Sequence, residues 1–316
     1  MSSPSVAVID IGSNSIKLLV AQKDSRGTLE ILKSQTEETR ISAGINKKNP
    51  SLSAEGMARS VASIQTLLSA AQPFAPQETV LVATSAVRDA TNGNDFRERV
   101  RSTTSHTVSI LSGTEEANLI GRGLTADPAL QNLQDFYLFD LGGGSLECLA
   151  FAQRKVQQSL SLQLGCVRLT ERCVPDSSAP FSAEARKAVD AATRDGFAKS
   201  NFQFSLPAGS PAVATGGTVT TTRVLIGARS GKAWAETSAA VTVAELEHML
   251  DEVAPLSLSG RQKIPGMPAS RADVFPTALA TLLTIAHLNG FTEFRHSMYN
   301  LRYGLASQML ERLSAV

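Results

Sequence analysis

The chain has 316 residues, which is longer than one hydrophobic core usually spans and predicts two lobes. Its 42% hydrophobic and 19% charged residues are typical of a globular protein, and the net charge of +1 argues against nucleic acid or a membrane as the main partner. The three cysteines, Cys148, Cys166 and Cys173, have no metal-ligand spacing and predict free thiols. The sequence shows neither a charged leader nor an apolar run of about 18 residues, so we expect a cytoplasmic protein.

The first predicted elements form a strand, a tight turn and a returning strand, and the pattern occurs twice. Strand 6–9 leads into the turn DIGSNS at Asp10 to Ser15, and strand 136–139 leads into DLGGGS at Asp140 to Ser145. Asp, Gly and Ser match at positions one, three and six, and aliphatic residues match at positions two, seven and ten. A repeat at this distance is too long for a solenoid and predicts two related lobes.

Further along the chain, strands alternate with helices, which predicts an α/β architecture with a largely buried sheet. Helical spacing of apolar residues and short β-rich runs place the remaining elements in order. We expect helices at 53–71, 94–101, 114–124, 183–198, 218–226, 243–253 and 271–288, strands at 79–84, 107–111, 156–164, 212–215 and 292–297, and loops at 127–134 and 227–235.

The two glycine-containing turns are candidates for binding phosphate groups. Backbone N–H groups in such turns donate to phosphate oxygens without steric obstruction. A carboxylate beside phosphate requires a divalent cation between them, and Mg²⁺ suits one or two carboxylates. Asp140 and Glu147 flank Gly142, Gly143 and Gly144, so they stand near each other across the hairpin. A single turn of this kind is more often an Asp that caps its own backbone, but two turns in register favour the phosphate interpretation.

The segment SGTEEA opens a predicted helix and contains two adjacent glutamates. Ser112 and Glu115 fit a capping box, which assigns Glu115 a structural role and leaves Glu116 unassigned. Glu116 would gain about 0.3–1 kcal/mol from the helix macrodipole in a purely structural role. The alternative is a general base that deprotonates a water for attack on phosphorus.

Two further segments are weak indications of anion binding. Arg88 follows a buried strand, where a guanidinium either grips phosphate or lies on the surface. Gly216, Gly217 and Thr218 lie between a strand and a helix start. The four histidines show no ligand spacing, and neither GxxxxGK[ST] nor GxGxxG is present, which disfavours P-loop and Rossmann folds.

Taken in order, the segments resemble the exopolyphosphatase/guanosine pentaphosphate phosphohydrolase (Ppx/GppA) family over almost the whole chain. The resemblance rests on DIGSNS at 10, ATSAVRDA at 83, SGTEEANLI at 112, DLGGGSLE at 140, LGCVRLTE at 164, ATGGT at 214, SRADV at 270 and NLRYGL at 300. It implies an α/β fold of two ribonuclease-H-like lobes around a central cleft, as in the actin, sugar-kinase and heat-shock-chaperone superfamily. The expected domains are 1–128 plus 300–316, and 129–299.

The resemblance also implies roles for individual residues. Glu116 resembles the general base, and Asp140 and Glu147 resemble the acids that hold Mg²⁺, with Asp10 as a helper. Arg88 resembles a substrate clamp. The implied phosphate cradle consists of Ser13, Asn14, Ser15, Gly142, Gly143, Gly144, Ser145, Gly216, Gly217 and Thr218. The substrate would be polyphosphate or guanosine pentaphosphate, acted on by a monomer or homodimer that binds neither nucleic acid nor membrane.

Two positions depart from the family pattern, and the chain lacks the extra C-terminal domains of longer relatives. Lys17 stands where many relatives carry His or Arg, and Tyr303 where the last motif often has Glu. Both departures bear on substrate preference. Two rival interpretations stay open: a protein that binds polyphosphate or guanosine tetraphosphate without turnover, and a kinase of the same superfamily.

Overall fold

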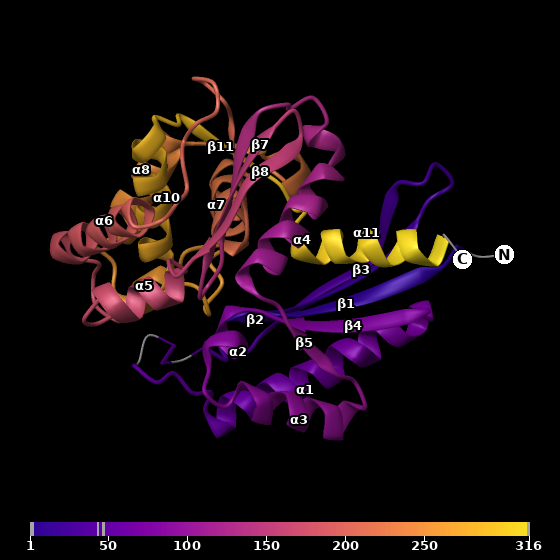
Figure 1. The fold of residues 1–316 in the computed structure, drawn as a ribbon. Coiled ribbons are helices and arrows are strands. Elements are labelled where there is room, and N and C mark those ends of the chain that lie inside the picture. Colours follow the sequence, from indigo (N-terminus) through magenta and orange to yellow (C-terminus); the bar gives the residue numbers. More distant parts are fainter. Residues whose placement is uncertain (1–2, 43, 46–47, 315–316) are drawn as a thin grey trace. The chain divides into compact units, whose positions relative to one another are not determined.

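The chain folds into two compact units, drawn in Figure 1. The computed structural model describes residues 3–42, 44–45 and 48–314, so the outer ends of the first predicted domain, residues 1 and 316, lie outside the described residues. Unit 1 is Met1–Gln131 with Tyr299–Val316, and unit 2 is Asn132–Met298. The domain boundaries expected from the sequence are 128/129 and 299/300.

Unit 1 is built on a five-stranded sheet of order β3-β2-β1-β4-β5. The first three strands are antiparallel, and β4 and β5 continue the sheet in parallel from β1. Its elements are β1 Ser5–Ile11, β2 Ser15–Lys23, β3 Leu29–Glu38, α1 Ala54–Ala71, η1 Gln72–Phe74, β4 Glu78–Ala83, α2 Ser85–Asp89, α3 Gly93–Thr104, β5 Val108–Ile110, α4 Gly113–Thr125, η2 Pro128–Leu130 and α11 Leu301–Ser314.

Helices cover both faces of the unit 1 sheet, so its central strands are apolar on both sides. The helices α1 and α3 lie on one face; on the other, α11 packs against β1 and β2, and α4 packs against α11 (Figure 1). On the second face Val6, Val8 and Leu19 pack against Ala306 and Met309 of α11. The helix at the end of the chain therefore completes the core around the first two strands.

The helices α4 and α11 approach so closely that glycine is needed on both. A Cβ atom at Gly123 would collide with the Asn300 carbonyl oxygen, and one at Gly304 would collide with the Leu119 carbonyl oxygen. The two glycines thus let the backbones of α4 and α11 touch directly.

Unit 2 contains a six-stranded sheet of order β10-β11-β9-β6-β7-β8. The strands β6, β7 and β8 form an antiparallel meander, β9 and β11 run parallel to β6, and β10 is an antiparallel edge. Its elements are β6 Phe136–Leu141, β7 Leu146–Ala152, β8 Lys155–Leu162, α5 Cys166–Cys173, α6 Ala183–Ala198, β9 Ala212–Thr215, α7 Gly217–Ser230, η3 Trp234–Glu236, β10 Ala240–Thr242, α8 Val243–Val253, α9 Leu258–Arg261, α10 Phe275–Asn289 and β11 Glu293–His296.

The core of unit 2 combines an aromatic cluster with a helix that is buried along most of its length. Tyr137 and Phe139 of β6 contact Phe202, Phe204 and Phe291 edge-on or tilted, with ring centroids 5.5–6.5 Å apart. Helix α10 is buried along most of its length and packs against α5, α6 and α8. Such a helix needs apolar or small residues all round, as its sequence has.

The two sheets confirm the internal repeat predicted from the sequence. The order β3-β2-β1-β4-β5 of unit 1 corresponds to β8-β7-β6-β9-β11 of unit 2, and β10 is an addition to the second sheet. The two turns are also alike: Gly12 N–H donates to Ser15 O at 3.1 Å, and Gly142 N–H donates to Ser145 O at 3.0 Å. Each unit is therefore one copy of the same α/β arrangement.

The structure differs from the sequence predictions in the bounds of two elements, and it adds elements that were not predicted, among them α2, α5, α9 and β10. The helix expected from Arg271 begins at Phe275, with Pro276 in its first turn, where the missing N–H is not needed. The loop expected at 227–235 is helical as far as Ser230, and the helix ends at Gly231 with φ +64°; η3 follows. Strand β3 was not predicted at all.

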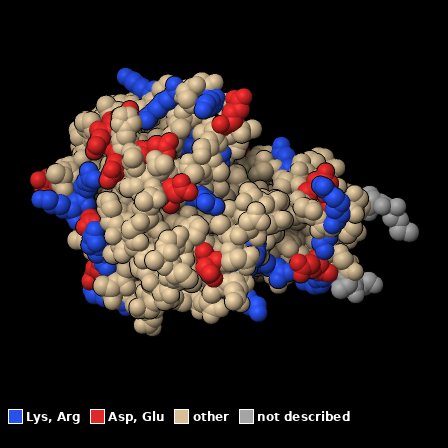
Figure 2. Space-filling model, turned by 90° about the horizontal axis from the view of Figure 1, so that it is seen from above, with Lys and Arg blue, Asp and Glu red and all other residues tan. Residues whose placement is uncertain are grey.

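In the described part of the chain, no helix combines the length and apolarity needed to span a membrane. On the face drawn in Figure 2, basic and acidic side chains are interspersed, and neither sign forms a continuous area.

Candidate phosphate-binding turns and catalytic residues

The β1–β2 turn of unit 1 holds its carbonyl oxygens toward the following segment. The Asn14 carbonyl accepts from the N–H groups of Thr39 and Arg40, and the Ser13 carbonyl accepts from Ser42 N–H. Ser13 Oγ lies 3.1 Å from Ser85 Oγ, and Asn14 Nδ2 donates to Glu38 Oε2 at 3.0 Å. Within the described residues, the backbone N–H groups of Ser13 and Asn14 make no hydrogen bond.

The β6–β7 turn of unit 2 is held in the same way. The Gly142 carbonyl accepts from Cys166 N–H at 2.9 Å, and the Gly143 carbonyl accepts from Val167 N–H at 2.8 Å. Arg168 Nε donates to the Gly144 carbonyl at 2.8 Å. The N–H groups of Gly143 and Gly144 have no partner in the described structure. In each turn, carbonyl oxygens are thus bound by neighbouring segments, while two backbone N–H groups have no partner among the described residues.

A row of side chains crosses each sheet beside its turn. In antiparallel strands, directly opposite residues share a face. In unit 2 the row is Thr215, Asp140, Glu147 and Ser161; in unit 1 the corresponding row is Val82, Asp10, Lys17 and Thr36. The register therefore places Lys17 where unit 2 has Glu147, and it confirms that Asp140 and Glu147 stand opposite each other.

Two carboxylates of the unit 2 row, those of Asp140 and Glu147, have neighbours that determine their surroundings. Ser161 Oγ donates to Glu147 Oε1 at 2.7 Å. Gly216 has φ +95°, and a Cβ there would come within 2.7 Å of Asp140 Oδ1, so only glycine leaves room for that carboxylate. Thr215 Oγ1 is buried beside Asp140 and has no hydrogen-bond partner.

This donor set fits Mg²⁺, which takes one or two carboxylates and completes its shell with water and phosphate oxygens. The unsatisfied Thr215 hydroxyl is suited to bond a water of that shell. Among the described residues, no group of three or more His, Cys, Asp or Glu side chains is placed to hold a metal ion.

Asp10 of unit 1 lies among cations. Burial raises the pKa of this carboxyl, and the nearby charges of Lys17 and Arg302 lower it in part. Asp10 Oδ1 is buried without a hydrogen bond, which is compatible with a ligand of a metal or of its water. The two cations would weaken cation binding there, so the structure gives Asp10 less support than Asp140 and Glu147.

The two glutamates at the start of α4 have separate roles. Glu115 forms the predicted capping box: Glu115 N–H donates to Ser112 Oγ, and Ser112 N–H donates to Glu115 Oε2. Glu116 is buried, and its Oε2 accepts from Arg88 Nη1 at 2.9 Å. The capping prediction is confirmed, and Glu116 is a buried carboxylate that the helix end does not require.

The turn before α7 carries an arginine that the sequence analysis did not assign. A Cβ at Gly217 would collide with the Arg271 guanidinium, so this group lies directly over the helix start. Its side chain has no hydrogen bond or ion pair to any residue the structure describes. A guanidinium beside helix N–H groups creates a positive site. Thr218 lies in the same turn, with its residue almost fully buried.

Arg168, Arg271 and Arg302 were all missed as candidate functional residues. They lie in the segments LGCVRLTE, SRADV and NLRYGL, so a signal was present. Their contacts with Gly144, Gly217 and the Leu18 carbonyl depend on tertiary structure that the sequence pattern does not reveal.

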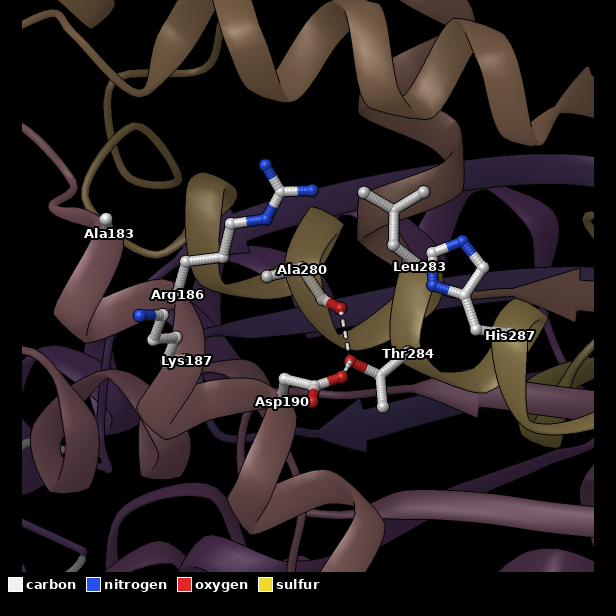
Figure 3. Close-up of a pocket in the computed structure, with 8 residues that line it drawn as sticks. All are labelled: Ala183, Arg186, Lys187, Asp190, Ala280, Leu283, Thr284 and His287. Atoms are coloured by element: carbon white, nitrogen blue, oxygen red, sulfur yellow. Dashed lines mark hydrogen bonds between the residues drawn. The ribbon is translucent and has the colours of Figure 1, made fainter.

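A separate groove of about 340 Å³ lies between α6 and α10 and contains none of the predicted site residues. Figure 3 shows Arg186 and Asp190 on one wall and Leu283, Thr284 and His287 on the other. Thr284 Oγ1 donates to Asp190 Oδ1 at 2.9 Å, which closes the floor. This groove is not at the phosphate-binding turns.

Comparison with solved structures defines the fold: the two-unit α/β arrangement of this chain is shared with two proteins of known structure. An exopolyphosphatase from Cytophaga hutchinsonii is 20% identical, with a TM-score of 0.86 and 98% of each chain covered. A Ppx/GppA family member from Aquifex aeolicus is 22% identical, with a TM-score of 0.79 and 99% of each chain covered.

The family follows from the sequence match. The family model described as the Ppx/GppA phosphatase family matches residues 19–313, and the chain belongs to that family. It is accordingly a phosphohydrolase of the Ppx/GppA type.

Proposed function

We propose that the chain releases orthophosphate from inorganic polyphosphate or guanosine pentaphosphate by hydrolysing a terminal phosphoanhydride bond, with Glu116 as general base. The observation that supports this proposal is that the two adjacent glutamates at the start of α4 make different contacts. Glu115 satisfies the helix end, whereas Glu116 is buried and held by Arg88. A carboxylate fixed in this way is suited to take a proton from an attacking water.

The substrate phosphates would be bound by backbone donors and by arginine. The uncommitted N–H groups of Ser13, Asn14, Gly143 and Gly144 provide short donors, and Arg271 adds a cation beside the start of α7. The remaining cradle residues predicted from the family lie in the same two turns and at the start of α7: Ser15, Gly142, Ser145, Gly216, Gly217 and Thr218. Arg88 contacts Glu116, which favours a positioning role over the clamp expected from the resemblance.

Asp140 and Glu147 would hold Mg²⁺, which when bound neutralises charge on the transferring phosphate. Ser161 orients Glu147, and the absence of a side chain at Gly216 leaves room for Asp140. Asp10 is a weaker candidate ligand. The proposal includes a cytoplasmic location, supported by the three free cysteines.

The decisive test is a matched pair of variants, Glu116→Gln and Glu115→Gln, assayed for orthophosphate release. We expect the first to lose about 100-fold or more of kcat, and the second to keep activity within a few-fold. Wild-type rates on long polyphosphate, short polyphosphate and guanosine pentaphosphate, each with Mg²⁺ or with EDTA, rank the substrates. Wild-type turnover by Glu116→Gln would disprove the assignment of the base. Tight calorimetric binding without phosphate release over hours would instead establish a sensor.

A further inference from the structure

Trp234 is the single tryptophan of the chain, and it lies in η3, where it is 39% exposed. The Arg223 guanidinium carbon sits 4.1 Å from the centroid of its ring, so one face of the indole is covered by a cation. His296 contacts the ring edge-on at 5.7 Å. A buried guanidinium and a buried imidazole thus hold an exposed aromatic ring in a fixed orientation.

The hydrogen bonds beneath the Trp234 indole determine which nitrogen of His296 carries the proton. Arginine only donates, so His296 Nδ1 accepts from Arg223 Nη1 at 2.9 Å, and its proton lies on Nε2. Nε2 faces Thr220 Oγ1 at 3.2 Å, and Thr220 Oγ1 in turn donates to the Gly216 carbonyl at 2.9 Å. Arg223 Nη2 also donates to the Thr237 carbonyl at 2.7 Å.

This network connects Trp234 to the turn beside Asp140. Only His296 and Thr220 stand between the indole and the Gly216 carbonyl. A ligand whose phosphates occupy the glycine turn would therefore have an aromatic platform close by, within unit 2. Inorganic polyphosphate has no group that uses it, whereas a nucleotide has a planar base.

We propose that Trp234 stacks the guanine base of a guanosine phosphate whose phosphate groups bind at the Gly216–Gly217 turn. The inference rests on the proposed function and refines it, because it assigns a subsite that separates nucleotide from inorganic substrates. Base–aromatic stacking suits this role since every base offers a π-face, and a ring already held in place loses little freedom on binding. The alternative is a purely structural role, in which the indole covers Arg223 and binds no ligand.

Because Trp234 is the single tryptophan, its fluorescence reports the subsite directly. We would titrate the full chain carrying Glu116→Gln, to prevent turnover, with guanosine diphosphate and, separately, with inorganic triphosphate, both in the presence of Mg²⁺. We expect saturable quenching by the nucleotide and none by triphosphate. No saturable quenching by the nucleotide would overturn the proposal.

Steady-state kinetics provide the second arm of the test, after the fluorescence titration. Trp234→Ala should raise KM for guanosine pentaphosphate about tenfold while leaving polyphosphate turnover unchanged, and Trp234→Phe should restore most of the affinity. Val156→Ala, another exposed apolar position in unit 2, is the control and should change neither substrate. Equal losses on both substrates would reveal a merely structural role and overturn the proposal.

The two arms separate this inference from the proposed function. If the wild type releases no phosphate from either substrate but the nucleotide still quenches Trp234, the hydrolase proposal fails and the stacking subsite stands. If guanosine pentaphosphate is hydrolysed without quenching, the subsite fails and the hydrolase proposal stands.

Discussion

Arg88 Nη1 donates to Glu116 Oε2 and to the Leu111 carbonyl oxygen, each 2.9 Å away. One guanidinium nitrogen therefore ties the end of β5 to the proposed base on α4. The Arg88 side chain is 22% exposed and that of Glu116 8%, so the pair is largely removed from water. In such a setting, removing one partner leaves a buried charge uncompensated.

The first prediction concerns this pair. Arg88→Lys keeps the charge but not the fork geometry, so we expect kcat to fall about tenfold or more with KM changed less than about threefold. Steady-state phosphate release measures the split. Arg97→Lys, on α3, is the control because Arg97 contacts the Val108 carbonyl and not Glu116. A rise in KM alone would show that Arg88 clamps the substrate directly.

The second prediction concerns the backbone at Gly216. Its φ of +95° is one that residues with a side chain rarely adopt, and an added Cβ would clash with Asp140 Oδ1. We expect Gly216→Ala to lower the free energy of unfolding by about 3 kcal/mol and to impair phosphate release.

Gly209→Ala is the matched control for this prediction. Gly209 has φ +81° and no atom within 4 Å of an added Cβ, so it reports backbone strain alone, about 1–2 kcal/mol. Urea denaturation measures both variants. Equal losses would mean that crowding against Asp140 is unimportant.

The third prediction concerns the contact between α4 and α11. Gly304→Ala would place a methyl group against the Leu119 carbonyl, so we expect a loss of about 3 kcal/mol or more. Gln308→Ala, at an exposed position of the same helix, should change stability by only about 0.5 kcal/mol. Thermal melts with circular dichroism would show both. A stable Gly304→Ala would require the two helices to separate without cost.

The fourth prediction concerns pH. Burial, and secondarily the charge of Arg223, lower the pKa of His296 to about 3 from its ordinary value of 6.5. Between pH 6.5 and about 3 the unfolded chain takes up a proton here that the folded chain refuses. The free energy of unfolding therefore falls with decreasing pH in that window, by at most about 1.4 kcal/mol per pH unit.

Urea melts from pH 4 to pH 7.5 would test this, with His296→Gln expected to show a shallower acid slope than the wild type. His248→Gln, at an exposed position on α8, is the control and should keep the wild-type slope. Identical slopes for all three proteins would contradict a buried neutral His296.

The repeated turns and the helix starts were predictable because their signals are local. Ser53, Ser112, Ser182 and Thr242 each cap the helix that follows, and side-chain capping needs only a few neighbouring residues. The matching strand order follows from the matching sequence of the two hairpins. The Asp140–Glu147 pairing was predictable for the same reason, since it is set by the length of one turn.

The features that the sequence analysis missed depend on contacts between segments far apart in the chain. Strand β3 has no fully buried residue and so gives no strong apolar pattern, and it is paired along its length with β2. The position of Arg271 over Gly217 joins segments far apart in the chain. Trp234 gives no local signal either, because its exposure and its stack on Arg223 appear only once α7 and β11 are packed.

The packing of α11 on β1 and β2 has a consequence for synthesis. Val6 and Val8 leave the ribosome about 300 residues before Ala306 and Met309, the residues that cover them. At about 5–20 residues per second, the first strands wait on the order of tens of seconds for their cover. Unit 2 is continuous in the chain and can finish its core in that interval. Unit 1 therefore completes its core only after the whole of unit 2 has been synthesised.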